Sequence, residues 1–145
     1  MALVDKDGLT YGDAQADIRD CLRQYSADEY PVEHFADAVC TCGSRQFQLA
    51  IDEEAGVAAR LCTACDNEHV MADGEAHVDQ AELEICECLC GEDAFEITLG
   101  VALYADSQDV RWLYVGCRCV ACGLTGCYGD WKNEAGDYQT LLGNT

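Results

Sequence analysis

The sequence predicts a mainly β protein with two tandem three-stranded antiparallel modules, preceded by a short N-terminal helix. Three observations lead to this fold class. A pattern of paired cysteines occurs twice along the 145-residue chain. The segments between the pairs alternate apolar and polar residues, which is typical of half-buried strands. The clearest helical periodicity lies ahead of the repeat, in residues 1–35.

The repeat joins two short cysteine pairs through an insert of hairpin length. The first copy begins with Cys40-Thr-Cys42-Gly, and the same pattern returns 48 residues later as Cys88-Leu-Cys90-Gly. A Cys-x-x-Cys pair closes each copy, formed by Cys62 and Cys65 in the first and by Cys119 and Cys122 in the second. An internal repeat of this kind indicates that one structural unit is used twice.

Each insert reads as a hairpin followed by a short third strand. In the first copy we expect strands near residues 46–51, 56–61 and 69–72, and in the second near 95–103, 110–116 and 128–132. The predicted organisation is a helical segment at 1–35, a first module at 36–73, an acidic connector at 74–85 and a second module at 86–145.

A single helix is expected before the repeat. Ile18, Cys21, Leu22 and Tyr25 follow the i, i+3, i+4, i+7 spacing of one helical face, and Pro31 ends the segment. Such an apolar stripe serves either to bind a partner or to cover the sheet of one module. We favour the covering role.

Twelve cysteines in 145 residues indicate either a disulfide framework or a metal protein. The N-terminal residues reach acidic side chains at once, without the basic and then apolar stretch of a secretory signal, and no apolar run is long enough to span a bilayer. We therefore expect a cytoplasmic protein with reduced thiols, which favours metal.

Two cysteine pairs brought together by a hairpin supply the four thiolates of a tetrahedral Zn²⁺ site. The spacing predicts two such sites per chain. The predicted ligands of the first are Cys40, Cys42, Cys62 and Cys65, and those of the second are Cys88, Cys90, Cys119 and Cys122. A histidine in place of one thiolate is a weaker alternative, for which His69 is the candidate.

The pattern resembles the zinc-ribbon and rubredoxin-like group of folds over residues 38–132. The resemblance rests on two cysteine turns, three strands, and a glycine after a cysteine at Gly43, Gly91 and Gly123. It implies zinc with a structural role, and iron as the alternative, since rubredoxin-like proteins use the same four thiolates to hold an iron that carries electrons. The closed four-thiolate design and the Cys-x-Cys spacing favour zinc.

Four cysteines lie outside these sets. Cys21 and Cys127 are expected in the core. Cys86 and Cys117 each lie two residues before a predicted ligand, and we favour buried thiols for them because free cysteine packs as a small apolar residue. A disulfide between them, or substitution of one of them for Cys88 or Cys90 as a ligand, is the alternative.

The formal net charge of −20 works against nucleic acid and anionic lipid as partners, because both require clustered Lys and Arg. The acids are spread evenly along the chain, which favours adaptation to a salty cytoplasm over mimicry of nucleic acid. The aromatic residues from Tyr104 onward are expected to pack in the core or against the N-terminal helix rather than to form a recognition surface.

The sequence contains no recognisable catalytic arrangement, neither an ordered Ser, His and Asp set, nor a glycine-rich phosphate loop, nor His-Glu-x-x-His. We therefore predict a protein that is not an enzyme but a metal-binding module for protein interaction or regulation. The alternatives are an iron electron carrier and a nucleic-acid-binding or transcription-associated ribbon.

Overall fold

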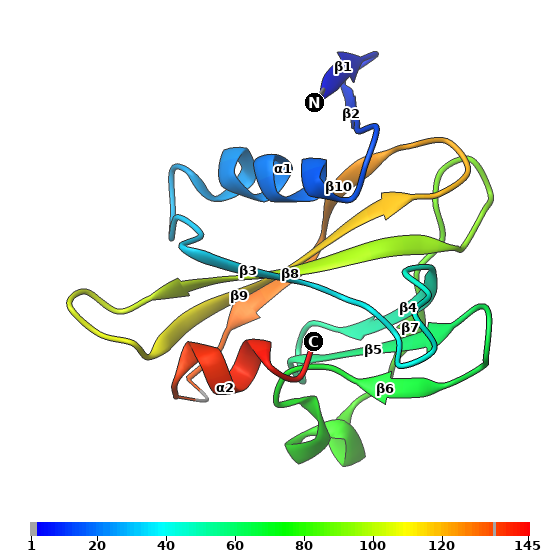
Figure 1. Ribbon diagram of the computed structural model, residues 1–145. Coiled ribbons are helices and arrows are strands. Elements are labelled where there is room, and N and C mark those ends of the chain that lie inside the picture. The colour runs from blue at the N-terminus through cyan, green and yellow to red at the C-terminus, as the bar shows by residue number, and fades with distance from the viewer. Residues whose placement is uncertain (1–2, 135) are drawn as a thin grey trace.

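Strands dominate the computed structural model, which describes residues 3–134 and 136–145 (Figure 1). The chain opens with a small separate hairpin, β1 (Val4–Lys6) and β2 (Leu9–Tyr11), followed by helix α1 (Ala16–Ser26) and strand β3 (His34–Asp37). The prediction of a mainly β fold with one helix ahead of the repeat is confirmed for this part of the chain.

Each copy of the repeat forms the three antiparallel strands expected of it. The first copy contains β4 (Phe47–Asp52), β5 (Val57–Cys62) and β6 (Glu68–Val70), and the second contains β8 (Phe95–Leu103), β9 (Val110–Cys119) and β10 (Thr125–Lys132). The acidic connector holds two 3₁₀ turns, η1 (Gly74–Ala76) and η2 (Val78–Gln80), and strand β7 (Glu84–Ile85). The chain ends with a helix that the sequence analysis missed, α2 (Tyr138–Leu142).

The strands of both copies belong to one eight-stranded sheet, so the fold does not divide clearly into two tandem three-stranded modules as expected. The strand order is β10-β9-β8-β4-β5-β6, with β3 also paired to β8 and β7 also paired to β4. The copies meet where β4 and β8 pair antiparallel at Phe47 and Phe95, which are equivalent positions of the repeat. A hairpin leaves one edge of its first strand unpaired, and pairing between copies satisfies that edge.

The two copies exchange strands reciprocally. Strand β3 precedes the first cysteine pair but lies beside β8 of the second copy, with Asp37 opposite Thr98. Strand β7 precedes the second cysteine pair but lies beside β4 of the first copy, with Ile85 opposite Ala50. Residues 37 and 85, and likewise 50 and 98, are 48 positions apart, so the two pairings are equivalent. The sequence repeat is therefore also a repeat in space.

The hydrogen bonds next to these strands repeat in the same way. The Ala38 amide donates to the Ile97 carbonyl at 2.8 Å, and the Cys86 amide donates to the Leu49 carbonyl at 2.8 Å. In both cases the donor stands two residues before the first cysteine of its own copy. The start of each cysteine turn is thus held by the opposite copy.

The main core is shared by both copies. Alternate residues of β4, β8 and β9 face it, and its largest fully buried side chains come from both repeats: Phe47, Leu49, Met71, Phe95, Ile97, Leu99, Val101 and Leu113. Tyr128 packs against Phe95 in an edge-to-face arrangement with ring centres 5.1 Å apart. One core formed by the strands of both copies buries more apolar surface than either copy could bury alone.

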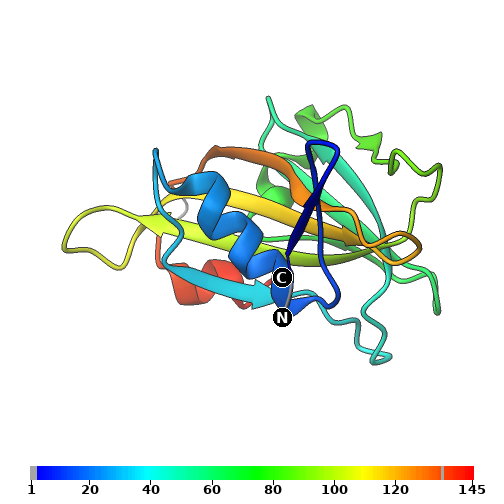
Figure 2. The same cartoon turned by 90° about the horizontal axis from the view of Figure 1, so that it is seen from above.

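Helix α1 covers the opposite face of β8, β9 and β10, as Figure 2 shows from above. Ile18 and Leu22 are fully buried against Ala102 and Tyr114. The Tyr114 hydroxyl donates to the Tyr30 carbonyl at 2.8 Å. The favoured role of the helix, covering the sheet, is confirmed, and the aromatic residues Tyr114 and Tyr128 serve in packing.

No helix within the described residues is long and apolar enough to cross a membrane.

Close packing between α1 and β9 depends on the absence of a side chain at Gly116. A Cβ at this position would lie 2.5 Å from Cγ2 of Ile18 and 3.0 Å from Cδ1 of Leu22. We expect Gly116→Ala to lower the free energy of unfolding by about 1–3 kcal/mol through overpacking, as measured by urea denaturation. Gly126→Ala is the matched control, because its Cβ would approach nothing closer than 4.0 Å. Equal stability of the two variants would contradict the helix placement.

Candidate metal centres

The eight predicted ligands gather into two groups of four. Within each group all four sulfur atoms lie within 4.8 Å of one another. The first consists of Cys40, Cys42, Cys62 and Cys65, and the second of Cys88, Cys90, Cys119 and Cys122. Each group joins the turn before a hairpin to the turn after it, so that pairs 20 to 34 residues apart along the chain meet in space.

The distances between sulfur atoms fit a tetrahedral metal ion. The shortest Sγ to Sγ separations are 3.5 and 3.6 Å in the first group and 3.6 and 3.7 Å in the second. Four sulfurs placed tetrahedrally about 2.3 Å from a zinc ion lie about 3.8 Å apart. A disulfide bond would require the two sulfur atoms to lie about 2.05 Å apart. Both groups could therefore hold a metal ion with little rearrangement.

The Cys-x-Cys-Gly turns have the same conformation in both copies. Gly43 and Gly91 adopt φ of 92° and 94°, and their amides donate to the carbonyls of Cys40 and Cys88 at 2.8 and 2.9 Å. Positive φ is accessible to glycine without steric cost. The glycine that follows each of these cysteine pairs thus lets two sulfurs on one tight turn point at a single centre.

The Cys-x-x-Cys turns are also equivalent, although only the second is followed by glycine. Gly123 has φ of 84°, and Asp66 takes the same place in the first copy with φ of 61°. The amide of each donates to the carbonyl of the first cysteine of its pair at 2.9 Å. Aspartate tolerates the left-handed region better than most residues, which explains why the turn survives without glycine.

Backbone amides around the sulfurs favour the thiolate form. Hydrogen bonding from the Cys42 amide lowers the pKa of Cys40 to about 6. Burial raises the pKa of Cys62, but hydrogen bonds from the Cys65 and Ala64 amides and from neighbouring thiols outweigh it, so the pKa lies below its usual value. The same balance lowers the pKa of Cys119. Thiolate is the form that binds metal. Each group therefore contains at least one thiol with a lowered pKa, while in four others burial and hydrogen bonds between thiols outweigh the backbone amides and raise the pKa: Cys42, Cys65, Cys88 and Cys122.

Among the described residues, only the first group has a buried cation beside it. The Arg60 side chain is 7 % exposed, its Nε donates to the Thr145 carbonyl at 2.9 Å, and its guanidinium carbon lies 4.6 Å from the centre of the Phe47 ring. Burial lowers the pKa of Arg60, while the nearby sulfurs of Cys40 and Cys62 act in the opposite direction. Its Nη1 is buried and lacks a hydrogen-bond partner among the described residues. The equivalent position in the second copy is the uncharged Cys117.

The remaining cysteines stay outside the two groups. No disulfide joins any of the twelve cysteines, all of which lie in the described part of the chain. Cys117 is fully buried, and burial raises its pKa well above the usual value, with the charge of Cys86 contributing. Cys86 is only half-buried, so the expectation of a buried thiol holds for Cys117 but not for Cys86, and Cys21 and Cys127 are half-buried instead of lying in the core as expected. Sequence spacing had correctly separated these four from the eight that converge.

His69 is a strand residue, as favoured over its role as a ligand. It lies on β6, and its Nε2 is 3.1 Å from the Asn144 carbonyl. It belongs to neither group of four thiols. This contact ties the C-terminal residues to the first copy.

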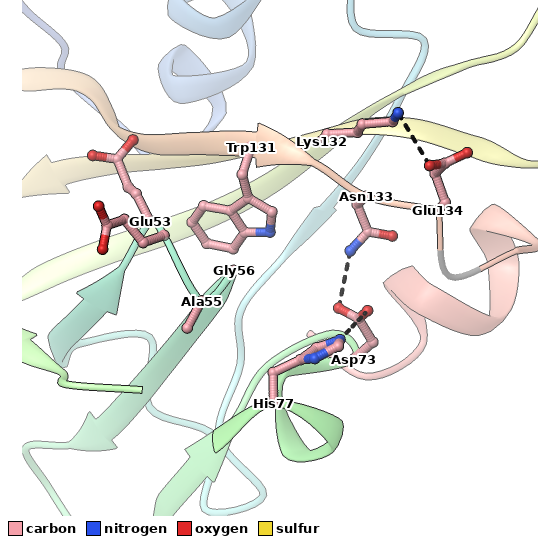
Figure 3. Close-up of a pocket in the computed structure, with 10 residues that line it drawn as sticks. Glu53, Ala55, Gly56, Asp73, His77, Trp131, Lys132, Asn133 and Glu134 are labelled. Carbon is pink, nitrogen blue, oxygen red and sulfur yellow. Dashed lines mark hydrogen bonds and ion pairs between the residues drawn. The ribbon is translucent and has the colours of Figure 1, made fainter. Parts of the chain in front are cut away.

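A surface hollow of about 570 Å³ lies between the β4–β5 turn, η1 and the end of β10, and the sequence analysis did not find it (Figure 3). Trp131 packs over Gly56 at its base, and Asp73 accepts a hydrogen bond from Asn133 Nδ2 at 2.9 Å. At the rim Lys132 pairs with Glu134 at 3.2 Å. Its residues come from three segments that are far apart in the sequence, so no local sequence signal could have brought them together.

The position of Arg60 leads to a prediction about the first group. Four thiolates and one divalent ion carry two net negative charges, which a buried guanidinium beside the sulfurs offsets. We expect Arg60→Met to weaken metal binding at the first site by about tenfold, the lower end of the effect of such neighbouring groups, and to leave the second site unchanged. Chelator competition followed by cadmium NMR would resolve the two sites. Arg23→Met, which removes the same charge from the exposed end of α1, is the control. An equal loss at both sites would contradict the assignment.

The chain was compared with protein families, curated proteins and solved structures. No family model, curated protein or solved structure matches the chain. The case for function therefore rests on the two cysteine groups and on the surface around them.

Proposed function

We propose that the chain is a non-catalytic zinc protein with two structural four-cysteine sites, and that it acts by binding a protein partner. The observation that carries the proposal is the convergence of two independent groups of four sulfurs at separations close to those of a tetrahedral zinc site. Reduced thiolate ligands fit a reducing compartment such as the cytoplasm.

A structural role is favoured because four thiolates leave no open position on the metal. Catalytic zinc keeps one position for water or substrate. Metal binding to a closed site contributes on the order of 10 kcal/mol to folding in small modules. Here each site would clamp the two ends of a hairpin whose first cysteine turn is also held by the other copy, so both ions would stabilise the shared sheet.

Zinc is favoured over iron, although the same thiolates can bind either ion. The favoured role for the sites is structural, and zinc serves that role without redox chemistry. Iron in the same sites would make the chain an electron carrier instead. The zinc protein and the iron protein would differ in a property that is simple to observe, the colour of the purified protein.

A protein partner is favoured over nucleic acid by the distribution of charge. The net charge is −20, and two of the three bases of the second copy already pair with acids, while the guanidinium carbon of the third, Arg111, lies 4.1 Å from the centre of the Tyr30 ring. Arg118 pairs with Glu96 at 2.8 Å, and Lys132 pairs with Glu134. The indole N–H of Trp112 donates to Asp130 at 2.9 Å, so the aromatic side chain beside these bases is engaged as well. Binding to a phosphate backbone would require a basic surface in place of this arrangement.

Native mass spectrometry tests the ligand assignment. We expect two metal ions per chain in the unmodified protein, one in Cys42→Ser and one in Cys122→Ser, because each substitution removes a ligand from a different group. Cys21→Ser is the matched control and should retain both ions, since this thiol lies outside the groups. Retention of two ions by both ligand variants would refute the assignment.

Absorption spectroscopy and metal removal test the identity and the role of the ion. We expect a colourless protein containing zinc by elemental analysis, and we expect a strong chelator to unfold the sheet cooperatively, as followed by circular dichroism. A red protein with visible absorption would establish the iron carrier instead. Full retention of folded structure after removal of both ions would exclude a structural role.

A further inference from the structure

We propose that the surface around β7 binds a basic segment of a partner protein, with one apolar side chain of that segment seated between β7 and β5. The inference rests on the proposed function as a protein-binding module and adds the location of the site and the chemistry of the partner. It derives from an apolar hollow and an acidic hollow that share Ile85 as a common border.

The apolar hollow lies on the outer face of β4 and β5, beside β7. It has a volume of about 150 Å³, and its apolar walls include Ala50, Leu61, Leu83 and Ile85. Ile85 is 67 % exposed and Leu83 is 36 % exposed. Apolar cavities of about 150 Å³ accommodate a benzene-sized group, so the space suits one Leu, Ile or Phe side chain.

The same face of the sheet is covered at its other end. Val57 is fully buried there, because Gly74 of η1 lies directly over Val57 and Val70. The covering ends before Ile85, which leaves large apolar side chains open on a strand of a sheet. An exposed apolar patch that is bordered by polar residues is typical of a protein interaction site.

The acidic hollow lies on the other side of Ile85 and has a volume of about 550 Å³. None of the ten residues that line it is Lys or Arg. Six of the ten are acidic: Asp52, Glu53, Glu54, Glu82, Glu84 and Glu87. Among the described residues none of the six takes part in a salt bridge. The negative potential of this hollow is therefore not balanced from within the chain.

The two hollows together define the partner. An unbalanced group of carboxylates attracts Lys and Arg and repels nucleic acid and anionic lipid. To fill the apolar hollow beside it, the partner segment must also carry an apolar side chain within one or two residues of those bases. A basic protein segment with a single apolar anchor meets both conditions, and the anchor would supply most of the affinity while the charges orient the segment.

A pair of short peptides tests the proposal on the metal-loaded protein. The probe is the acetylated and amidated peptide Gly-Lys-Leu-Arg-Lys-Gly, and its matched control replaces Leu by Ser. We expect saturable changes in NMR amide signals at Leu61, Leu83 and Ile85 with the first peptide, and about tenfold weaker binding of the second, the change expected for partial burial of one leucine.

Two protein variants separate the apolar from the charged contribution. Ile85→Ser alters an exposed side chain and should reduce binding of the Leu peptide about fivefold or more while leaving the Ser peptide unchanged. The double variant Glu82→Gln with Glu84→Gln should weaken both peptides and reduce the dependence of binding on salt. The controls are Val4→Ser, on a 54 % exposed valine of β1, and Glu75→Gln with Asp79→Gln, which removes the same charge elsewhere.

The possible results separate the proposed binding site at β7 from the proposed function as a protein-binding zinc module. Equal binding of both peptides with signal changes spread over the whole acidic surface would overturn it, as would no binding of either peptide. Localised binding at another surface would overturn the β7 site while leaving a protein-binding function in place. The metal content of the same samples, measured separately, decides whether the zinc module itself exists.

Discussion

The reciprocal exchange of strands between the two copies is the constraint on which the rest of the structure depends. Strand β3 completes the hairpin of the second copy, and β7 completes the hairpin of the first. Each exchange satisfies an edge that would otherwise expose unpaired backbone groups. It also brings the apolar faces of both hairpins into one core centred on Phe47 and Phe95. The first cysteine turn of each copy directly follows a strand that is paired with the other copy, so the order of each cysteine group depends on the pairing between the copies.

The two cysteine groups show how a repeat keeps its chemistry while its surroundings diverge. The turns, their hydrogen bonds and the burial of their sulfurs are the same in both copies. The residue behind them differs, with Arg60 in one copy and Cys117 in the other. A guanidinium next to the sulfurs offsets negative charge, whereas a neutral thiol does not. The two groups have the same four cysteines but differ in electrostatics, and the difference comes from a residue outside the cysteine pattern.

The surface suggests how a chain of such high negative charge can still recognise a partner selectively. Acidic residues are spread along the whole sequence, and charge distributed so evenly gives no specificity by itself. Selectivity requires a feature found in one place. The exposed Ile85, beside six carboxylates that form no salt bridge among the described residues, is such a feature, because apolar contact is not screened by salt while the charges around it are. In a salty environment the apolar anchor would retain its contribution as the electrostatic one weakened.

The sequence by itself determined the eight clustering cysteines, the three strands of each copy and a helix through residues 18–25, because each depends on spacing within a few residues or on one repeated pattern. It did not reveal α2, the exchange of β3 and β7, the neighbourhood of Arg60 or the hollows beside β7. The pairing of β3 with β8 joins residues about sixty positions apart, and Arg60 meets the carbonyl of Thr145 at the end of the chain. Only the tertiary structure decided these features, because a free strand edge accepts any extended segment, and which segment reaches it depends on the packing of the whole core.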